Sequence, residues 1–225
     1  VSKRIEREVK SRTMRPVFVI PIQNMFAPVS GQPKPVGVSD GFNFVTISRL
    51  TKEKQTRHII DALAFIPDAS LVIVGEGPER KRLEKRVLKR KLKNRVRFVG
   101  WQADIKPYLE HASAYVCASR YEGFGLALFE AARFGKAIVT TDVGIVGEML
   151  LNATDALVVN GTVEGLSQGM RRVIDEPSLS ATLGASARHS AEAYAITEET
   201  YLVRYKEALE ACVTGERHSS LRLNQ

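Results

Sequence analysis

Two glycines and two carboxylates lie close together in the segment from Ser119 to Glu130. Gly123 and Gly125 stand where a predicted strand passes into a predicted helix. Glycines let a ligand approach the backbone closely, and the free amides of a first helical turn attract an anion. We therefore predict a phosphate cradle at this turn.

The two carboxylates flank this predicted cradle. Glu130 lies about one and a half turns into the helix, and helical side chains lean toward the N-terminus, so its carboxylate can reach the same ligand. A carboxylate that accepts two hydrogen bonds is the natural partner of a ribose diol. Glu122 would face the group that the phosphates carry. The alternative is a plain strand-to-helix turn followed by a solvated Glu130.

A second turn, Ser48–Lys54, directly follows the first predicted strand of the alternating region. Arg49 offers a planar fork and Lys54 a point charge, the combination that a diphosphate site needs. Two basic residues near a turn are by themselves usually solvated. Their position after a strand, opposite the glycine turn, favours binding.

A third turn, Gly75–Arg80, has two glycines but lacks the pattern of a nucleotide loop. A P-loop ends in Gly-Lys-Ser/Thr, and a dinucleotide fingerprint has a third glycine where Arg80 stands. Pro78 suits a first helical position. We therefore predict a structural role for these glycines.

No metal or hydrolase motif accompanies these turns. The sequence has no Asp-x-Asp pair at a strand end, no Gly-x-Ser-x-Gly elbow, and no metal spacing among His58, His111, His189 and His218. We expect no metal ion, so Arg49, Lys54 and the helix amides would neutralise a diphosphate.

The elements that must position these residues alternate regularly from Phe42 onward. Continuous apolar strands separated by helices of about ten residues predict parallel pairing in a doubly wound α/β sheet. Ligands bind beyond the carboxyl ends of such strands, where the three turns lie. The predicted strands are 44–48, 71–75, 96–100, 115–118, 137–141 and 156–159. The predicted helices are 54–66, 79–92, 104–111, 125–134, 145–151, 162–176, 178–194 and 197–212.

The region before Phe42 is organised differently. Apolar residues spaced by four predict a short helix over 1–13, and Pro16–Pro21 reads as a brief strand. Residues 21–42 contain seven prolines and glycines, which indicates a linker. The first residue is Val, so we expect a piece of a longer polypeptide.

Charge is concentrated in one segment. The net charge is +8, yet Arg80–Arg97 alone holds eleven Lys or Arg and one acid. On a helix from Glu79 to Leu92, Leu83, Val87, Leu88 and Leu92 would form one buried stripe with the lysines facing out. This localisation weakens a general nucleic-acid-binding function, which stays an alternative. No apolar run is long enough to span a membrane, and two cysteines suit a reducing cytoplasm.

Taken in order, these turns resemble the nucleotide-sugar-binding half of family 4 retaining glycosyltransferases of GT-B architecture. Ser48-Arg49-Leu50 with Lys54 is similar to the family's Gly-Arg-Leu followed by Lys. Glu122 and Glu130 match its Glu-x7-Glu motif with Gly-Phe-Gly inside. Gly144 and Glu148 resemble its Gly-Gly-x-x-Glu element. The resemblance implies a Rossmann-like fold that forms the C-terminal half of the GT-B architecture.

The resemblance also implies roles. Arg49 and Lys54 would bind the diphosphate, Glu122 would touch the sugar, and all three would be catalytic. The amides near Phe124, Gly125 and Leu126 would hold sugar and phosphate, and Glu130 would bind ribose. The implied donor-binding residues are Ser48, Arg49, Lys54, Gly100, Trp101, Gln102, Glu122, Gly123, Phe124, Gly125, Leu126 and Glu130, with Gly100–Gln102 beside the base.

The resemblance implies the following organisation: residues 1–21 as a remnant of an N-terminal acceptor domain, 22–42 as interdomain linker, 43–196 as the nucleotide-sugar-binding domain, 197–212 as a crossing helix and 213–225 as a flexible tail. The expected activity is metal-independent hexosyl or N-acetylhexosaminyl transfer to a glycan or lipid-linked acceptor. A UDP-sugar donor is favoured, with a GDP-sugar as the alternative. The acceptor domain is missing, so this fragment alone would be inactive.

Two further expectations follow from the resemblance. A lipid-carried acceptor would bring the cytoplasmic protein to the inner face of a membrane, where Arg80–Arg97 would contact anionic headgroups. A GT-B sugar-nucleotide epimerase is the enzymatic alternative. It is disfavoured because such epimerases lack the Glu-Gly-Phe-Gly-Leu arrangement.

Overall fold

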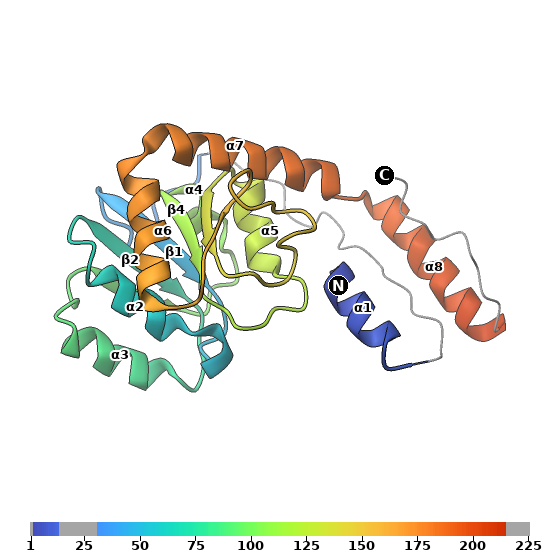
Figure 1. The fold of residues 1–225 in the computed structure, drawn as a ribbon, viewed down its shortest axis with the longest axis horizontal. Coiled ribbons are helices and arrows are strands. Elements are labelled where there is room, and N and C mark those ends of the chain that lie inside the picture. The colour runs from blue at the N-terminus through green and yellow to red at the C-terminus, as the bar shows by residue number, and fades with distance from the viewer. Residues whose placement is uncertain (1, 14–30, 215–225) are drawn as a thin grey trace. The chain divides into compact units, whose positions relative to one another are not determined.

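A parallel sheet of six strands is the centre of the structure, a computed structural model that describes residues 2–13 and 31–214. The strand order is β3-β2-β1-β4-β5-β6, and every neighbouring pair is parallel. This is the order of a Rossmann sheet. The strands are β1 (Phe42–Ile47), β2 (Ala69–Val74), β3 (Val96–Gly100), β4 (Ala114–Cys117), β5 (Ala137–Thr140) and β6 (Leu157–Val158) (Figure 1).

Helices cover both faces of the sheet, which confirms the predicted doubly wound α/β fold. Helices α2, α3 and α6 contribute to the main hydrophobic core on one face, and α4 packs on the other. Helix α7 packs along α5 and β5. The helices are α2 (Thr56–Leu63), α3 (Arg80–Lys89), α4 (Lys106–Glu110), α5 (Leu126–Arg133), α6 (Val163–Asp175) and α7 (Pro177–Tyr194), with a short 3-10 helix η1 (Lys52–Lys54) before α2.

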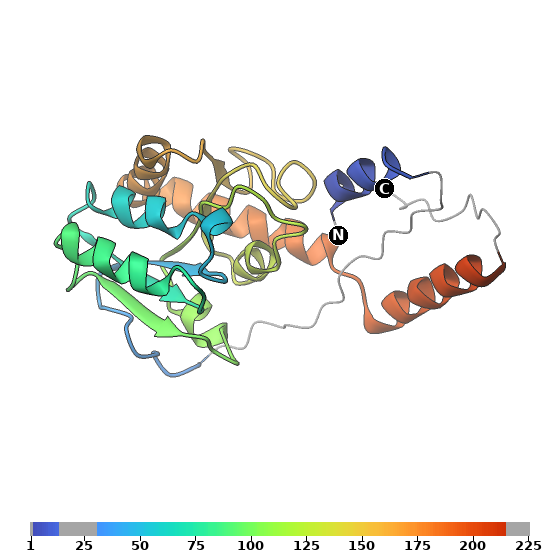
Figure 2. The same ribbon diagram turned by 90° about the horizontal axis from the view of Figure 1, so that it is seen from below.

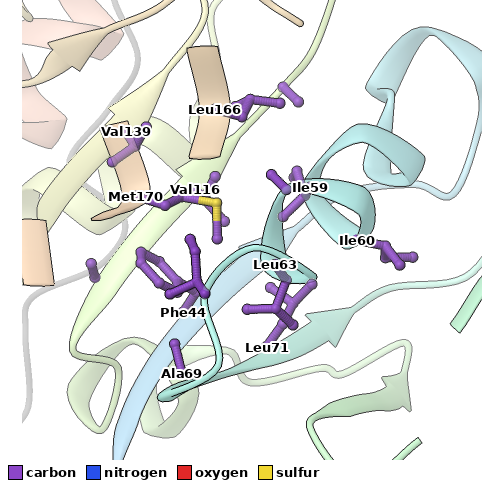
Figure 3. Close-up of a cluster of buried hydrophobic side chains, with 14 of the residues drawn as sticks. Phe44, Ile59, Ile60, Leu63, Ala69, Leu71, Val116, Val139, Leu166 and Met170 are labelled. Atoms are coloured by element: carbon purple, nitrogen blue, oxygen red, sulfur yellow. The ribbon is translucent and has the colours of Figure 1, made fainter. Parts of the chain in front are cut away.

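Neighbouring residues of one strand serve the two faces. Phe44 of β1 lies in the main core with Ile59 of α2 and Met170 of α6 (Figure 3). Val45 packs on the opposite face near Tyr108 of α4. Side chains alternate across a strand, so a strand covered on both faces must be apolar throughout. This explains the continuous apolar runs in the sequence.

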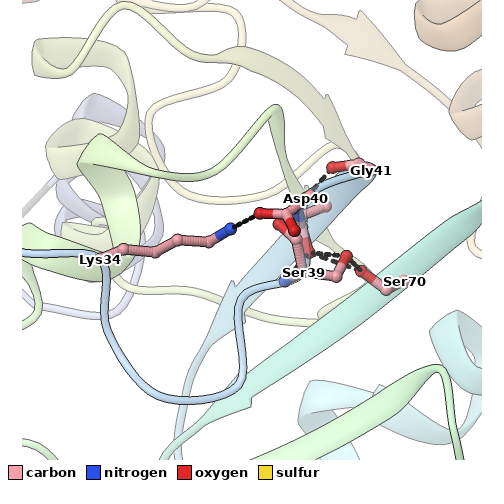
Figure 4. Close-up of polar contacts among 6 residues, drawn as sticks. Lys34, Ser39, Asp40, Gly41 and Ser70 are labelled. Carbon is pink, nitrogen blue, oxygen red and sulfur yellow. Dashed lines mark hydrogen bonds and ion pairs between the residues drawn. The ribbon is translucent and has the colours of Figure 1, made fainter.

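A buried asparagine fixes the start of β1. Asn43 Oδ1 accepts hydrogen bonds from Ser39 N at 2.9 Å, Ser39 Oγ at 2.8 Å and Ser70 Oγ at 2.6 Å. Lys34 pairs with Asp40 in the same stretch (Figure 4). These contacts join the segment before β1 to the neighbouring strand β2.

The direction of strand succession reverses between β1 and β4. Strand β1 pairs with β2 on one side and with β4 on the other. The turns that follow β1 and β4 therefore lie side by side at one edge of the sheet. Such a switch point is where open α/β sheets bind ligands.

The predicted helix over 145–151 is wrong. The segment forms turns, with an isolated bridge between Val146 and Leu150. Gly144 and Gly147 have φ of 57° and 79°, a left-handed conformation that a helix excludes. The alternation of apolar residues reflects burial of Ile145 and Met149 in a compact loop.

One position of the apolar stripe predicted over Glu79–Leu92 is also wrong, and the helix α3 ends before Leu92. Leu83, Val87 and Leu92 are buried, but Leu88 is 59% exposed. Arg86 and Arg90 instead turn toward Asp61 of α2, which is buried. Part of the basic segment therefore anchors α3.

A smaller unit contains α1 (Lys3–Lys10) and α8 (Glu198–Thr214). Helix α1 lies within the predicted helix over 1–13, and α8 corresponds to the predicted helix over 197–212. Leu202, Val203 and Leu209 of α8 are about half exposed. The predicted strand Pro16–Pro21 and residues 215–225 lie outside the described residues. No helix in the described part of the chain has the length and apolarity to cross a membrane.

Candidate functional site

Arg49 lies in a turn whose backbone is fixed by β2. Ser48 N donates to Val74 O at 3.1 Å, and Leu50 N donates to Glu76 O at 2.8 Å. The Leu50 side chain is fully buried, whereas Arg49 is exposed. No ion pair to the Arg49 guanidinium is found among residues 2–13 and 31–214. A rigid turn thus presents a cation at the switch point.

The glycines of the third turn pack against this backbone. A Cβ atom at Gly75 would lie 2.0 Å from Ser48 O, and one at Gly77 would lie 2.5 Å from Leu50 O. Either contact is far closer than a Cβ atom tolerates, so only glycine fits. The predicted structural role of Gly75 and Gly77 is confirmed. These glycines place the turn that carries Arg49.

An ion pair joins the turns after β1 and β4. Lys54 Nζ lies 2.7 Å from Glu122 Oε1, and the two side chains are only 19% and 18% exposed. Ser119 Oγ donates to the same oxygen at 2.8 Å. The structure therefore brings together two of the predicted residues across the switch point. The pair holds both charges in place at limited exposure.

The glycine turn before α5 is held by a second loop. Gly125 has φ of 93° and precedes the first residue of α5, Leu126, which is exposed. Ile145 N donates to Phe124 O at 2.9 Å, and a Cβ atom at Gly144 would lie 2.1 Å from that same oxygen. The loop at Gly144 therefore fixes the direction of the first helical amides.

Glu130 is a half-buried carboxylate on α5. Burial raises the pKa of Glu130 to about 7. Within the described parts of the chain, no hydrogen bond or ion pair to this carboxylate is found. This desolvation argues against the solvated-surface alternative. A carboxylate that is desolvated and unpaired is ready to accept hydrogen bonds from a ligand.

The turn after β3 carries the residues expected beside a base. Gly75 N donates to Gly100 O at 2.7 Å, so this turn touches the third turn. Trp101 is 72% exposed, and Gln102 Nε2 donates to Val99 O at 2.7 Å. No hydrogen bond or ion pair between this turn and Glu130 is found in the part of the chain described.

Three contributors to the site were not among the predicted site residues, although Gly144 was matched to a family element. Ser119 orients Glu122, and its spacing of three residues is a local signal that could have shown this. Gly144 approaches the Phe124 carbonyl oxygen only because the fold brings the two loops together. Tyr194 has a ring contact with Phe124 at 6.1 Å and donates to Glu148 Oε1 at 2.6 Å. Tyr194 lies far along the chain, so the sequence offers no signal for it.

Two histidines in the described part of the chain form hydrogen bonds to backbone carbonyls and so stabilise the fold. His58 Nδ1 lies 2.7 Å from Gly161 O, and His111 Nε2 lies 2.8 Å from Gln32 O. Over residues 2–13 and 31–214, no group of three His, Cys, Asp or Glu side chains could hold a metal ion.

Known proteins match most of the chain. The family model described as "Glycosyl transferases group 1" matches residues 33–190. The lipopolysaccharide core biosynthesis glycosyltransferase LpsD of Rhizobium meliloti is 33% identical over 148 residues, which are 65% of this chain and 43% of that protein. A glycogen synthase of Mycobacterium tuberculosis is 33% identical over 149 residues, 63% of this chain and 36% of that protein. The chain spans less than half the length of these relatives.

Solved structures share the fold. Anabaena HepE in complex with UDP and glucose is 26% identical with a TM-score of 0.72, over 78% of this chain and 50% of that chain. The pneumococcal O-GlcNAc transferase GtfA has a TM-score of 0.75 over 95% of this chain and 44% of that chain. At 21% identity it supports the fold alone. Because the family model spans well over half of the chain and the sheet agrees with it, the chain belongs to the glycosyl transferases of group 1, as a Rossmann-like domain of the GT-B type.

Proposed function

We propose that this chain is the donor-binding domain of a metal-independent retaining glycosyltransferase that uses a UDP-sugar. The observation that carries the proposal is the partly buried Lys54–Glu122 pair at the switch point, flanked by Arg49 and by the helix start at Gly125. Cations and helix amides converge there on the edge where such sheets bind ligands. The UDP complexes of the similar structures support the choice of nucleotide.

In this proposal the diphosphate binds between the two turns. Arg49 and Lys54 supply the positive charge, and the amides at Phe124, Gly125 and Leu126 add the positive end of helix α5. When the bond from sugar to phosphate breaks, negative charge grows on the leaving diphosphate. Fixed cations and amides stabilise that charge without reorganising, so catalysis is mainly electrostatic.

Glu122 and Glu130 bind the two ends of the donor. Glu122, held by Ser119 and Lys54, accepts hydrogen bonds from the sugar hydroxyls, while Gly123 leaves room for the sugar beside the backbone. Glu130 accepts hydrogen bonds from the ribose diol, which relieves its desolvation. Ser48 and Gly100–Gln102 complete the donor site on the side of the base.

The acceptor is bound by a second domain in this proposal. The matched relatives are more than twice as long as their shared segment with this chain. Residues 1–21 would end that domain, 22–42 would link it to the donor-binding domain at 43–196, and the helix over 197–212 would return to it, followed by a tail at 213–225. The acceptor would be a glycan or a lipid-linked sugar.

Membrane association belongs to the same proposal. Lys81, Lys85 and Lys89 of α3 are exposed, whereas Arg86 and Arg90 bind Asp61. The three lysines would attract anionic headgroups at the inner face of a membrane by about 1 kcal/mol each. Changing them together to Gln would abolish sedimentation of the protein with anionic vesicles. Unchanged sedimentation would contradict this part of the proposal.

Calorimetric titration in the presence of a chelator tests the donor assignment. The chain should bind UDP and UDP-glucose under these conditions, and GDP more weakly. An Arg49→Gln, Lys54→Gln double variant should lose most of the affinity, since both diphosphate cations are removed. A Lys85→Gln, Lys89→Gln variant removes the same charge from α3 and should bind UDP like the parent. Loss of all parent binding on chelation would refute metal independence.

A further inference from the structure

A second basic pocket lies beside the proposed donor site and uses none of its residues. The pocket has a volume of about 310 Å³ and lies where helices α2 and α3 begin, beside Arg120. Figures 1 and 2 both show α2 and α3 side by side. Its polar and charged lining includes Lys52, Thr56, Arg57, Glu79, Arg82 and Arg120.

The charges of this pocket are unbalanced. Four cations face one carboxylate, and that carboxylate, Glu79, lies 3.4 Å from Arg82. For Lys52, Arg57 and Arg120, no carboxylate within 4.0 Å is found in the parts of the chain that the structure describes. Like charges gathered on one cavity repel one another, so an anion bound among them is stabilised.

Neutral hydrogen-bond donors line the same pocket. The Thr56 hydroxyl is buried in a residue that is only 2% exposed, and no hydrogen-bond partner for it is found among residues 2–13 and 31–214. A buried hydroxyl without a partner is unfavourable, so rotation of the Thr56 side chain toward a ligand oxygen in the pocket would be favoured. Thr56 and Arg57 also open helix α2, where amides have no acceptor within their own helix. The positive end of the helix therefore adds to the cations.

From these observations we propose that the pocket binds the phosphate group of a phosphomonoester, as a second anion site separate from the donor diphosphate. Arg57, Arg82 and Arg120 offer planar forks that match phosphate oxygens in pairs. At about 30 Å³ per water molecule, the pocket has the volume of about ten waters. The pocket is larger than a lone phosphate, so it has room for the small group that carries one.

The pocket is connected to the donor residues through the backbone. Arg120 N donates to Glu53 O at 2.8 Å, which joins the turn after β4 to η1. Lys54 directly follows Glu53, and Glu122 lies two residues after Arg120. A ligand in the pocket therefore lies close to the segments that carry the Lys54–Glu122 pair, and a phosphorylated acceptor or effector bound there would sit next to the sugar. Only this last statement rests on the proposed function.

The test is titration of the parent chain at low ionic strength with glucose 6-phosphate, inorganic phosphate and vesicles that contain phosphatidic acid. An Arg57→Gln, Arg120→Gln variant should bind glucose 6-phosphate roughly tenfold more weakly or worse, because two charge-assisted contacts are lost. Both side chains are exposed and have no ion pair within the described part of the chain, and Arg120 is anchored by its amide, so the variant should fold. Thr56→Val should weaken binding as well.

A Lys85→Gln, Lys89→Gln variant is the matched control, since it loses the same charge on α3 outside the pocket. Glucose 6-phosphate binding that is tighter than inorganic phosphate binding supports a sugar phosphate as the source. For the vesicles the control is an Arg172→Gln, Arg188→Gln variant, which loses two exposed charges outside both the pocket and the lysines proposed to bind membranes. Vesicle binding that the pocket variant loses and this control keeps supports a lipid headgroup.

Absence of parent binding to all three probes would overturn the proposal. Equal losses in the pocket variant and the control would do so too, because they indicate general charge attraction. UDP titrations on the same preparations should be unchanged in both variants. Failure of UDP binding alone would contradict the proposed function and leave the phosphate pocket supported.

Discussion

Single residues of the site hold charge in places where water is limited. Lys54 and Glu122 form an ion pair, whereas Glu130 has no hydrogen-bond or ion-pair partner in the described chain and a pKa raised to about 7 by burial. Keeping an unpaired carboxylate out of water destabilises a fold. Such a cost is typical of functional sites, where the group is completed by a ligand.

Replacing Glu130 tests its contact with ribose. Glu130→Ala should weaken UDP binding by about 1.5–3 kcal/mol, because charge-assisted hydrogen bonds are lost. Glu130→Gln keeps one acceptor oxygen and should recover part of the loss. Calorimetry gives both values, and thermal unfolding controls for folding. Parent-like affinity in both variants would remove Glu130 from the proposed site.

The same carboxylate predicts a pH dependence. Hydrogen bonds from ribose favour the ionised form, so donor binding should lower the pKa of Glu130 from about 7 and release a proton. UDP-glucose affinity should be constant well above pH 7 and should fall as the pH drops below 7, by up to about tenfold per unit. UDP-glucose is the better probe, since it lacks a terminal phosphate that titrates near pH 6. A flat profile for the parent, or the same slope for Glu130→Gln, would contradict the assignment.

Among the elements, loops without regular structure decide the geometry of the site. The loop at Gly144 supports Phe124 O and so aims the first turn of α5. The Gly75–Gly77 turn does the same for Arg49. In both cases a glycine permits backbone contact that any side chain would block.

Substitution of two glycines in one loop distinguishes the cost of left-handed backbone from the cost of a clash with Phe124. Gly144→Ala and Gly147→Ala both place a Cβ atom on left-handed backbone, which costs about 1–2 kcal/mol each. Only the Cβ atom at Gly144 meets the Phe124 carbonyl, and space is open at Gly147. Gly144→Ala should therefore cost about 1–3 kcal/mol more in unfolding free energy. It should also weaken UDP binding, which Gly147→Ala should preserve. Equal effects would show that the contact is unimportant.

The anchoring of α3 gives a second test at this scale. Burial alone would raise the pKa of Asp61, but hydrogen bonds from Arg86 and Arg90 more than offset this and lower it. Asp61→Asn should cost about 1–3 kcal/mol at neutral pH in urea unfolding. The difference should shrink as the pH falls into the acid range, where the parent carboxylate is protonated. Asp68→Asn removes an exposed carboxylate near Arg171 and should leave stability unchanged.

At the scale of the whole molecule, the chain should bind the donor but should not transfer the sugar. The 225-residue chain should bind UDP-glucose yet release no UDP above background with any glycan or lipid-linked acceptor, because orienting two reactants requires a closed crevice. A UDP-release assay over a panel of acceptors measures this. Robust transfer by this chain would place the acceptor site within it.

The sequence by itself determined the fold class and indicated the residues of the proposed site. Burial of both faces leaves continuous apolar strands, and helices leave their own periodicity, so six strands could be placed within a few residues from local pattern alone. The Gly123–Gly125 turn and the carboxylates at Glu122 and Glu130 were visible for the same reason. Where local pattern misled, at residues 145–151, two left-handed glycines replaced a helix with a loop.

Only the tertiary structure decided which of these groups meet. The strand order places the turn after β1 beside the turn after β4, and so pairs Lys54 with Glu122. The packing of α3 against α2 places Arg86 and Arg90 beside Asp61. The fold also brings Arg57 and Arg120 into one pocket. These contacts join residues that are distant in the chain. Their formation depends on how strands are ordered and helices packed, which no local pattern of residue types records.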